Sequence, residues 1–105
     1  MDSAASAPSA PPGGPPARTW ISGTTGFLGQ WVCREMSEDI LIRPTRAEAP
    51  LERPGALAAH LRASGATRAV HLAAAAGEHA HDLAQLKRLN VDAAREVVEA
   101  AMDLQ

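Results

Sequence analysis

The sequence predicts an α/β fold: a partial, truncated doubly wound (Rossmann-like) parallel sheet of about three strands with flanking helices. Short apolar runs that suit buried strands alternate with longer segments whose apolar residues recur at helical spacing. A glycine-rich turn stands where the first apolar run ends and the first helical segment begins. Strands alternating with helices form parallel β-α-β units with right-handed crossovers, so we expect helices on both faces of the sheet.

The first 18 residues differ in composition from the rest. Residues 1–18 hold five of the eight prolines and contain no leucine, isoleucine, valine or aromatic residue. Such a segment cannot bury enough apolar surface to offset its ordering entropy, so we expect a disordered arm. Residues 19–105 suffice for one small domain, and this length excludes a two-domain enzyme with its own substrate domain.

Charge and cysteine content exclude several classes of protein. The net charge of −2 does not mark a nucleic-acid or membrane-surface binder. Cys33 is the single cysteine, so an internal disulfide and a cysteine-built zinc site are excluded. There is no apolar run of membrane-spanning length and no secretory signal at the N-terminus. We expect a soluble, cytoplasmic protein.

The first half of the domain reads as strand, helix, strand. Residues 19–22 form a short apolar run that ends in glycine, which is typical of a buried strand. Residues 27–36 are predicted as a helix, and four of its side chains are spaced to face a sheet: Leu28, Trp31, Val32 and Met36. Residues 40–42 are a second buried strand, which Pro44 ends.

The second half continues with a loop, a helix, a strand and a helix. Residues 43–54 are loop, followed by a helix over 54–63 with Pro54 near its first turn and Gly65 as its stop. Residues 69–73 are the third strand. A helix is predicted over about 82–104, from the spacing of Leu83, Leu86, Ala94, Val97, Val98 and Ala101. In the doubly wound order the first strand lies between the other two.

The chemistry is expected at the turn after the first strand. Its G-x-x-G-x-x-G pattern places Gly23 for a tight turn, Gly26 for close approach of a pyrophosphate, and Gly29 for close helix packing. The helix that follows would offer N–H groups and its positive dipole end to phosphates. Strand, turn and helix in this order favour nucleotide binding over a turn that merely needs positive φ. The candidate residues are Gly23, Thr24, Thr25, Gly26, Phe27, Leu28 and Gly29.

Three segments resemble one family. SGTTGFLG at 22–29 is similar to the T-G-x-x-G-F-[LI]-G signature of extended short-chain dehydrogenases/reductases, the NAD-dependent epimerase/dehydratase family. VHLAA at 70–74 and NVDAA at 90–94 resemble two later motifs of that family, and the match covers about residues 18–103. The resemblance implies an NAD(P)-binding Rossmann domain over 19–105. It adds four cofactor-site residues: Leu72, Ala73, Ala74 and Asn90.

Departures from the family pattern limit what the chain can do. The family transfers hydride between a nucleotide sugar, or a related alcohol or ketone, and nicotinamide, using a catalytic Y-x-x-x-K tyrosine and lysine. This sequence has no tyrosine, so we expect no catalytic residue and no activity from this chain alone. Ala93 and Ala94 stand where the family has glycine and threonine. The strand and the adenine-contacting Asp segment that the family has between its second strand and the next helix are not found before Pro54.

Two interpretations of function therefore stay open. The chain is either the N-terminal, cofactor-binding portion of such an enzyme, with a small-molecule substrate only if a C-terminal part exists, or a non-catalytic NAD(P)-binding module or truncated remnant. We expect no nucleic-acid or membrane partner. An unpaired sheet edge makes self-association a further expectation.

The cofactor preference is predicted from charge. About 20 residues after the first motif glycine, a carboxylate would hold the ribose diol of NAD, whereas an arginine would accommodate the phosphate of NADP. That position is Arg43, and Arg46 follows closely. Both are candidate cofactor contacts, so the sequence favours NADP, with NAD as the alternative. The simplest interpretation, without a ligand, is a solvated loop arginine.

The remaining polar residues receive structural interpretations. His71, within an apolar strand, is expected to be a core histidine bonded to backbone. We expect no metal site in the polar loop formed by Glu78, His79, His81 and Asp82. A solvated helix face is predicted for Arg88, Asp92, Arg95, Glu96 and Glu99.

Overall fold

The computed structural model describes residues 16–74 and 82–104. The predicted disorder of residues 1–15 lies outside these ranges. The elements, in chain order, are β1 (Arg18–Ser22), α1 (Phe27–Glu35), β2 (Ile40–Ile42), α2 (Ala56–Ala63), β3 (Arg68–His71), α3 (Leu83–Leu86), the π-helical segment η3 (Lys87–Asp92) and α4 (Ala93–Ala101).

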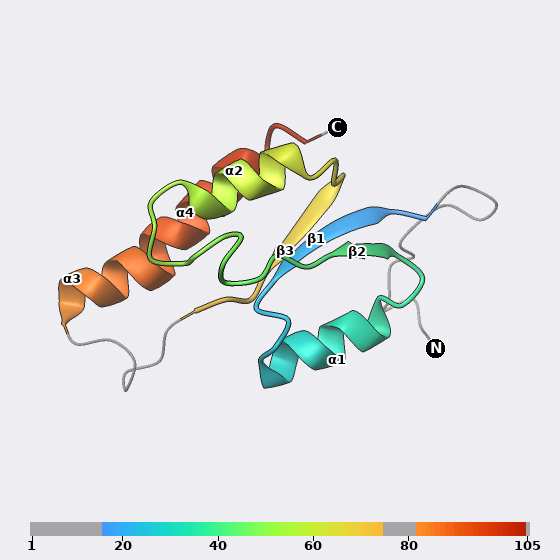
Figure 1. Ribbon diagram of the computed structural model, residues 1–105, viewed down its shortest axis with the longest axis horizontal. Coiled ribbons are helices and arrows are strands. Elements are labelled where there is room, and N and C mark those ends of the chain that lie inside the picture. The colour runs from blue at the N-terminus through green and yellow to red at the C-terminus, as the bar shows by residue number, and fades with distance from the viewer. Residues whose placement is uncertain (1–15, 75–81, 105) are drawn as a thin grey trace, which may run out of the picture.

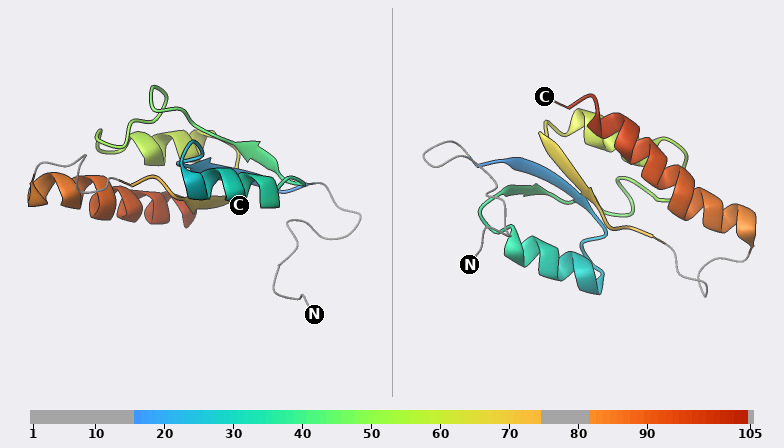
Figure 2. Two further views of the ribbon diagram at one scale, coloured as in Figure 1. Left: turned by 90° about the horizontal axis from the view of Figure 1, so that it is seen from below. Right: turned by 180° about the vertical axis from the view of Figure 1, so that it is seen from behind.

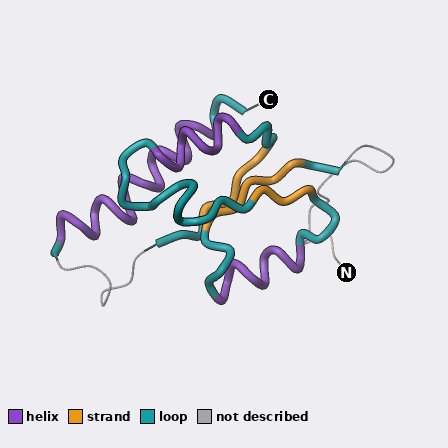
Figure 3. The backbone as a smooth tube through the Cα atoms, viewed as in Figure 1, coloured by secondary structure: helices purple, strands orange, loops and turns teal. Residues whose placement is uncertain are grey.

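The three strands form one parallel sheet in the order β2-β1-β3, which confirms the predicted fold class and the central place of the first strand. In the register, Trp20 lies between Ile42 on one side and Ala69 on the other. Since the strands are parallel, the loops that follow them leave from the same end of the sheet (Figure 3). Over the described ranges no strand intervenes between β2 and α2.

The two faces of the sheet are covered by different helices. α1 lies on one face, and α2 and α4 lie side by side on the other (Figures 1 and 2). Since side chains alternate along a strand, Trp20 and Ser22 point to the α2–α4 face, while Thr19 and Ile21 point to the α1 face.

The hydrophobic core lies on the α2–α4 face. Trp20 is fully buried there, and its indole Nε1 donates a hydrogen bond to Nδ1 of His60 on α2 at 3.0 Å. This bond satisfies the one polar atom that the large side chain takes into the core. The other buried members of the cluster are small or aliphatic: Ala49, Leu57, Ala58, Leu61, Ala66, Ala93, Val97 and Ala100.

The amino end of the sheet is held by a buried polar cluster. Thr19 Oγ1 donates to Oδ2 of Asp39 at 2.6 Å and accepts from Nε of Arg68 at 2.8 Å, while Nη2 of Arg68 also pairs with Asp39. Because the three residues belong to β1, the turn before β2, and β3, the cluster ties all three strands together. β1 itself begins at Arg18, which we had assigned to the arm.

Of the four α1 side chains predicted to face the sheet (Leu28, Trp31, Val32 and Met36), the first two do not. Leu28 and Trp31 are 59% and 48% exposed. The more buried stripe runs through Gly29, Val32, Cys33 and Met36 instead. The closest packing of the helix is made by Gly29 against the turn that precedes it, because only a residue without a side chain permits the contact described below.

The other two helical regions differ from prediction in detail. α2 begins at Ala56, after Gly55 in the left-handed region, so Pro54 lies before the helix, while Gly65 follows its end with a φ of +77° as expected. The predicted C-terminal helix is a helical run from α3 to α4 whose middle, η3, is π-helical. Two residues of the predicted apolar face, Leu83 and Val98, are exposed.

Arg88 and Glu96 do not belong to a solvated face, which corrects a further prediction. Both carboxylate oxygens of Glu96 accept hydrogen bonds from the N terminus of α2, from N–H of Gly55 at 3.1 Å and of Ala58 at 3.0 Å. Arg88 Nη2 donates to Oε1 of Glu96 at 2.7 Å and to the carbonyl oxygens of Leu51 and Arg53 at 3.3 Å. The pair therefore holds α2 and the preceding loop against the C-terminal helices.

None of the helices in the described part of the chain combines the length and apolar character that a bilayer-spanning segment requires.

Candidate nucleotide-binding site

The glycine-rich turn joins β1 to α1 and touches the end of β3. Gly23 has a φ of +77°, in the left-handed region that favours glycine. A Cβ at Gly23 would lie 2.6 Å from the backbone nitrogen of Ala73. The turn and the residues after β3 are therefore in backbone contact, and a side chain at Gly23 would separate them.

Gly29 makes a second close backbone contact, with the glycine-rich turn itself. A Cβ there would lie 2.0 Å from the carbonyl oxygen of Gly23 and 2.7 Å from Cα of Thr24. The first turn of α1 therefore packs directly on the backbone of the glycine-rich turn. This refines the predicted role of Gly29, since the closest contact is with the turn rather than with a strand.

Gly26 has no such packing requirement. A Cβ there would meet its nearest atom, Gly23 O, at an ordinary 3.5 Å, and φ is −76°. Neither the backbone conformation nor a neighbour therefore demands glycine at this position. What glycine does provide here is open access to the backbone at the start of α1, as the approach of a phosphate would require.

The start of α1 carries hydrogen-bond donors without a side-chain cap. Gly26 is the N-cap residue, it makes no side-chain cap bond, and the first turn has no acidic residue. Helix geometry leaves the first N–H groups, including those of Phe27 and Leu28, without intrahelical acceptors. Together with the positive end of the helix dipole, these groups favour an anion.

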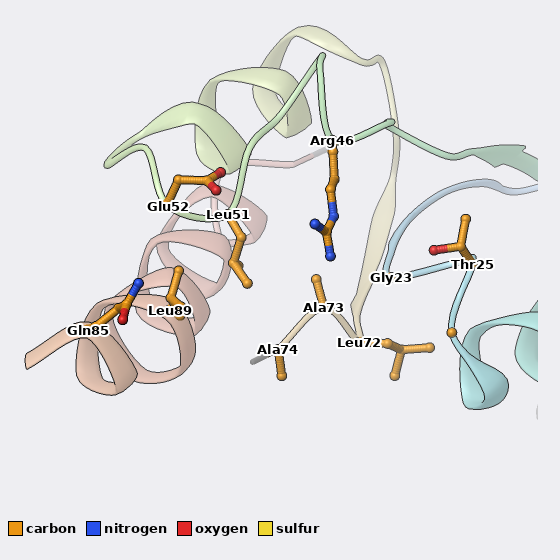
Figure 4. A pocket seen from close by; sticks show the side chains of 11 residues that line it. Gly23, Thr25, Arg46, Leu51, Glu52, Leu72, Ala73, Ala74, Gln85 and Leu89 are labelled. Atoms are coloured by element: carbon orange, nitrogen blue, oxygen red, sulfur yellow. The ribbon is translucent and has the colours of Figure 1, made fainter. Parts of the chain in front are cut away.

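A cavity of about 430 Å³ opens beside this turn at the carboxyl ends of β1 and β3 (Figure 4). The structure brings seven of the residues predicted from sequence together in its lining: Gly23, Thr25, Gly26, Arg46, Leu72, Ala73 and Ala74. They come from three segments, namely the glycine-rich turn, the loop after β2 and the residues after β3. The position agrees with the rule that ligands of open α/β sheets bind outside the carboxyl ends of strands where the strand order reverses.

The other candidate residues lie outside the lining of this cavity: Thr24, Phe27, Leu28, Gly29, Arg43 and Asn90. All of Phe27, Leu28 and Gly29 belong to α1. Gly29 is buried against the glycine-rich turn, whereas the side chains of Phe27 and Leu28 are exposed. Asn90 lies in η3, next to Leu89, which does line the cavity.

The two candidate arginines are separated by the structure. Arg46 extends from the loop after β2 into the cavity, close to Ala73 in the view of Figure 4. Arg43 is exposed and does not line the cavity. A guanidinium beside the glycine-rich turn can donate paired hydrogen bonds to a phosphate.

Four lining residues were not predicted from the sequence: Leu51, Glu52, Gln85 and Leu89. They come from the loop before α2 and from the C-terminal helical run, and lie across the cavity from the glycine-rich turn (Figure 4). The two leucines supply an apolar wall, while Glu52 and Gln85 add hydrogen-bonding groups. Nothing local in the sequence marks these residues, because they come from two segments far apart in the chain, which the hydrogen bond from Arg88 to the Leu51 carbonyl oxygen holds together.

The floor of the cavity rests on a hydroxyl–imidazole pair. His71 Nδ1 lies 2.7 Å from Ser22 Oγ, so the predicted bond of this histidine to backbone is replaced by one to a side chain. Ser22 Oγ also accepts hydrogen bonds from the N–H groups of Leu72 and Ala73, both at 3.1 Å. Burial lowers the pKa of His71, and the carboxylate of Glu96 acts in the opposite direction.

The polar loop after β3 is mostly outside the described residues, which include Asp82 but not Glu78, His79 or His81. Asp82 Oδ1 accepts a hydrogen bond from N–H of Gln85 at 2.7 Å and caps α3. Within residues 16–74 and 82–104, no group of three His, Cys, Asp or Glu side chains is arranged to hold a metal ion.

Fold and site together define a Rossmann-like α/β fragment with a cavity at the switch point of its sheet. The chain is similar to a solved structure named DdhaC, with a TM-score of 0.72 and 20% sequence identity. The similarity covers 85% of this chain and 27% of DdhaC, so the chain spans about a quarter of the length of that structure. No protein-family model matches the sequence, and a search of curated proteins finds no match.

Proposed function

We propose that this chain binds a dinucleotide cofactor, NADP or NAD, in the cavity beside the glycine-rich turn. The observation that carries the proposal is Gly26, where glycine is required neither by backbone conformation nor by packing within the described residues. Access of a pyrophosphate to the uncapped N-terminus of α1 explains it.

The rest of the cavity supports the same ligand class. Arg46 supplies a cation next to the turn, and Leu51 and Leu89 supply an apolar wall opposite it. A phosphate-binding end and an apolar end in one cavity are the features that a nucleotide needs. Arg46 also supports NADP over NAD, since a guanidinium suits the additional phosphate of NADP.

We further propose that the chain is the cofactor-binding portion of an extended short-chain dehydrogenase/reductase acting on a nucleotide sugar or a related alcohol or ketone. The three sequence motifs support this role, as does the position of two of them, the glycine-rich turn and residues 72–74, at the cavity. Hydride transfer would be the chemistry of the bound cofactor. The residues of this chain would bind and orient it.

The alternative is a non-catalytic NAD(P)-binding module, which the absence of tyrosine from the sequence favours. The coding sequence after residue 105 distinguishes the two functions. An in-frame tyrosine followed four residues later by lysine supports the enzyme, whereas a stop codon directly after residue 105 supports the module.

The binding proposal is tested by titrating NADP⁺, NAD⁺ and ADP-ribose into the full chain by calorimetry, for the wild type and Gly26→Ala. We expect saturable binding by the wild type and at least about tenfold weaker binding by the variant, with similar unfolding transitions for both. The proposal is wrong if the wild type shows no saturation up to about 1 mM, or if the variant binds equally well.

A further inference from the structure

The Ser22–His71 pair lies directly beneath the proposed nucleotide site. The two residues are lateral partners in the register of β1 and β3, so their side chains leave the same face of the sheet. Ser22 is buried, with 2% of its surface exposed. Its hydroxyl has three partners, His71 Nδ1 at 2.7 Å and the N–H groups of Leu72 and Ala73 at 3.1 Å.

The three contacts allow the proton positions to be inferred. A serine hydroxyl has one proton and two lone pairs. The N–H of Ala73 takes one lone pair, and the N–H of Leu72 is shared between this hydroxyl oxygen at 3.1 Å and the carbonyl oxygen of Ser22 at 3.2 Å. Because no other acceptor for the hydroxyl proton is found among its contacts, we infer that it is directed to Nδ1 and that neutral His71 carries its proton on Nε2, a buried atom that has no hydrogen-bond partner among the described residues.

A proton on Nδ1 of His71 would disrupt this arrangement. A third donor would be added at the Ser22 oxygen, and the hydroxyl proton would lose its acceptor in a buried position. The N–H of Leu72 also reaches the carbonyl oxygen of Ser22 at 3.2 Å. The N–H of Ala73, within the described residues, has the Ser22 hydroxyl as its acceptor, so Ala73 is the first group to be released.

The released segment is part of the cavity. Leu72, Ala73 and Ala74 line it, and the backbone of Ala73 is in direct contact with Gly23. We propose that His71 is a positioning residue for the nucleotide: through the Ser22 hydroxyl it fixes the strand end that lines the cavity, and the nucleotide binds to the form in which its imidazole is neutral. This inference rests on the proposed function of the cavity.

The surroundings of His71 set the direction of its titration. The ionisable groups on the elements that cover this face are Glu96 of α4, its ion-pair partner Arg88 in η3, and His60 and Arg62 of α2. Lys87 and Asp92 of η3 pair with each other, and Arg95 and Glu99 lie on the exposed side of α4. Burial lowers the pKa of His71, and Glu96 opposes this only in part. Binding is therefore expected to be complete at neutral pH and to be lost below the usual histidine range.

The test is the pH dependence of ADP-ribose binding to the full chain between about pH 5 and 8, with the fold checked by circular dichroism at each pH. ADP-ribose is chosen because its pyrophosphate does not titrate there. For the wild type we expect affinity to fall about tenfold for each pH unit below the pKa of His71. In His71→Asn the amide oxygen accepts the Ser22 proton and cannot titrate, so affinity should stay within about threefold of the wild-type value at pH 8 and be independent of pH.

Three further variants separate positioning from general stability. Ser22→Thr keeps the hydroxyl and should retain the wild-type pH profile, while Ser22→Ala should bind weakly at every pH. His60→Asn makes the same substitution at the histidine bonded to Trp20, and its pH profile should match that of the wild type. Long-range ¹H–¹⁵N spectra at pH 8 should show the His71 proton on Nε2.

The outcomes are distinguishable. A wild type that does not bind ADP-ribose at pH 8 overturns the proposed function and this inference with it. A wild type that binds with no pH dependence, a His71→Asn variant that keeps the wild-type profile, or a proton on Nδ1 at pH 8 overturns the inference alone.

Discussion

Glu96 Oε1 accepts a hydrogen bond from Arg88 Nη2 at 2.7 Å, although the two residues are eight positions apart along η3 and α4. The same carboxylate caps α2, and the same guanidinium binds the loop that contributes Leu51 to the cavity. One ion pair in the C-terminal helices therefore supports one wall of the candidate site.

Removal of this carboxylate is expected to destabilise the fold. Glu96→Ala leaves Arg88 without its ion-pair partner and two N–H groups of α2 without their acceptor, so the free energy of unfolding should fall by about 2 kcal/mol. Chemical denaturation measures the change. Glu99→Ala, on the exposed side of the same helix, is the matched control and should change stability by less than about 0.5 kcal/mol.

The contribution of Glu96 should also depend on pH. Burial alone would raise its pKa, but the hydrogen bonds from Arg88, Ala58 and Gly55 outweigh burial and hold the pKa below its ordinary value. A carboxyl group whose pKa is lowered by folding stabilises the protein above the ordinary glutamate range, and this stability is lost as the pH falls through the lowered pKa. Glu96→Gln should therefore lose less stability than the wild type on acidification. Equal losses in denaturation curves recorded from neutral to acid pH would contradict this explanation.

The three glycines of the turn should respond differently to alanine. Gly29→Ala would place a Cβ 2.0 Å from Gly23 O, a distance that forces the backbone to move, and should cost at least about 2 kcal/mol of stability. Gly23→Ala meets both a positive φ and the backbone of Ala73 and should cost a similar amount. Gly26→Ala loses only the preference of an N-cap position for glycine over alanine and should cost about 1 kcal/mol or less. Thermal denaturation of the three variants compares these values, and a Gly26 variant as unstable as the other two would remove the argument for a ligand at that position.

The matched pair Arg46→Ala and Arg43→Ala tests which arginine selects the cofactor. Arg46 lines the cavity and Arg43 does not, so only the first substitution should reduce the preference for NADP⁺ over NAD⁺, by about tenfold or more. Calorimetric titrations with the two nucleotides give the ratio of affinities. If the Arg43 variant shows the larger loss, the loop after β2 moves on binding and the assignment to Arg46 is wrong.

Self-association should proceed through a sheet edge. β2 is an edge strand in the described sheet, and Ile40 at its start is exposed. Ile40→Lys should lower the average mass measured by sedimentation at high concentration, because a lysine on an edge strand opposes further pairing. Leu28→Lys removes an exposed apolar group on α1, where Leu28 is 59% exposed against 42% for Ile40. A larger effect of the Leu28 variant would assign association to the helix instead.

Much of this fold could be predicted from the sequence because its signals are local. Apolar runs mark the three strands, and the glycine-rich turn marks the start of α1. The sheet-facing side of α1 was misassigned because periodicity counts apolar side chains, whereas here the closest contact is made by Gly29, which has none.

The parts of the site that could not be predicted depend on residues far apart in the chain. Glu96 appears as one charge among several on a helix, and its acceptor role is visible only when α2 packs on α4. The same holds for His71, whose partner Ser22 is 49 positions away, and for Leu51 and Leu89 in the cavity wall. Local periodicity carries no information about such pairs.

The alternation along β1 links the stability of this domain to its ligand. Trp20 faces the hydrophobic core and Ser22, two residues on, faces the floor of the cavity, while Thr19 and Ile21 face α1. An alanine inserted after Trp20 would leave the core tryptophan in place and turn the serine hydroxyl away from His71 toward the opposite side of the sheet. Such a protein should fail to bind ADP-ribose, as calorimetry would show. The number of residues in one strand is thus a determinant of recognition that no single substitution in the cavity can reveal.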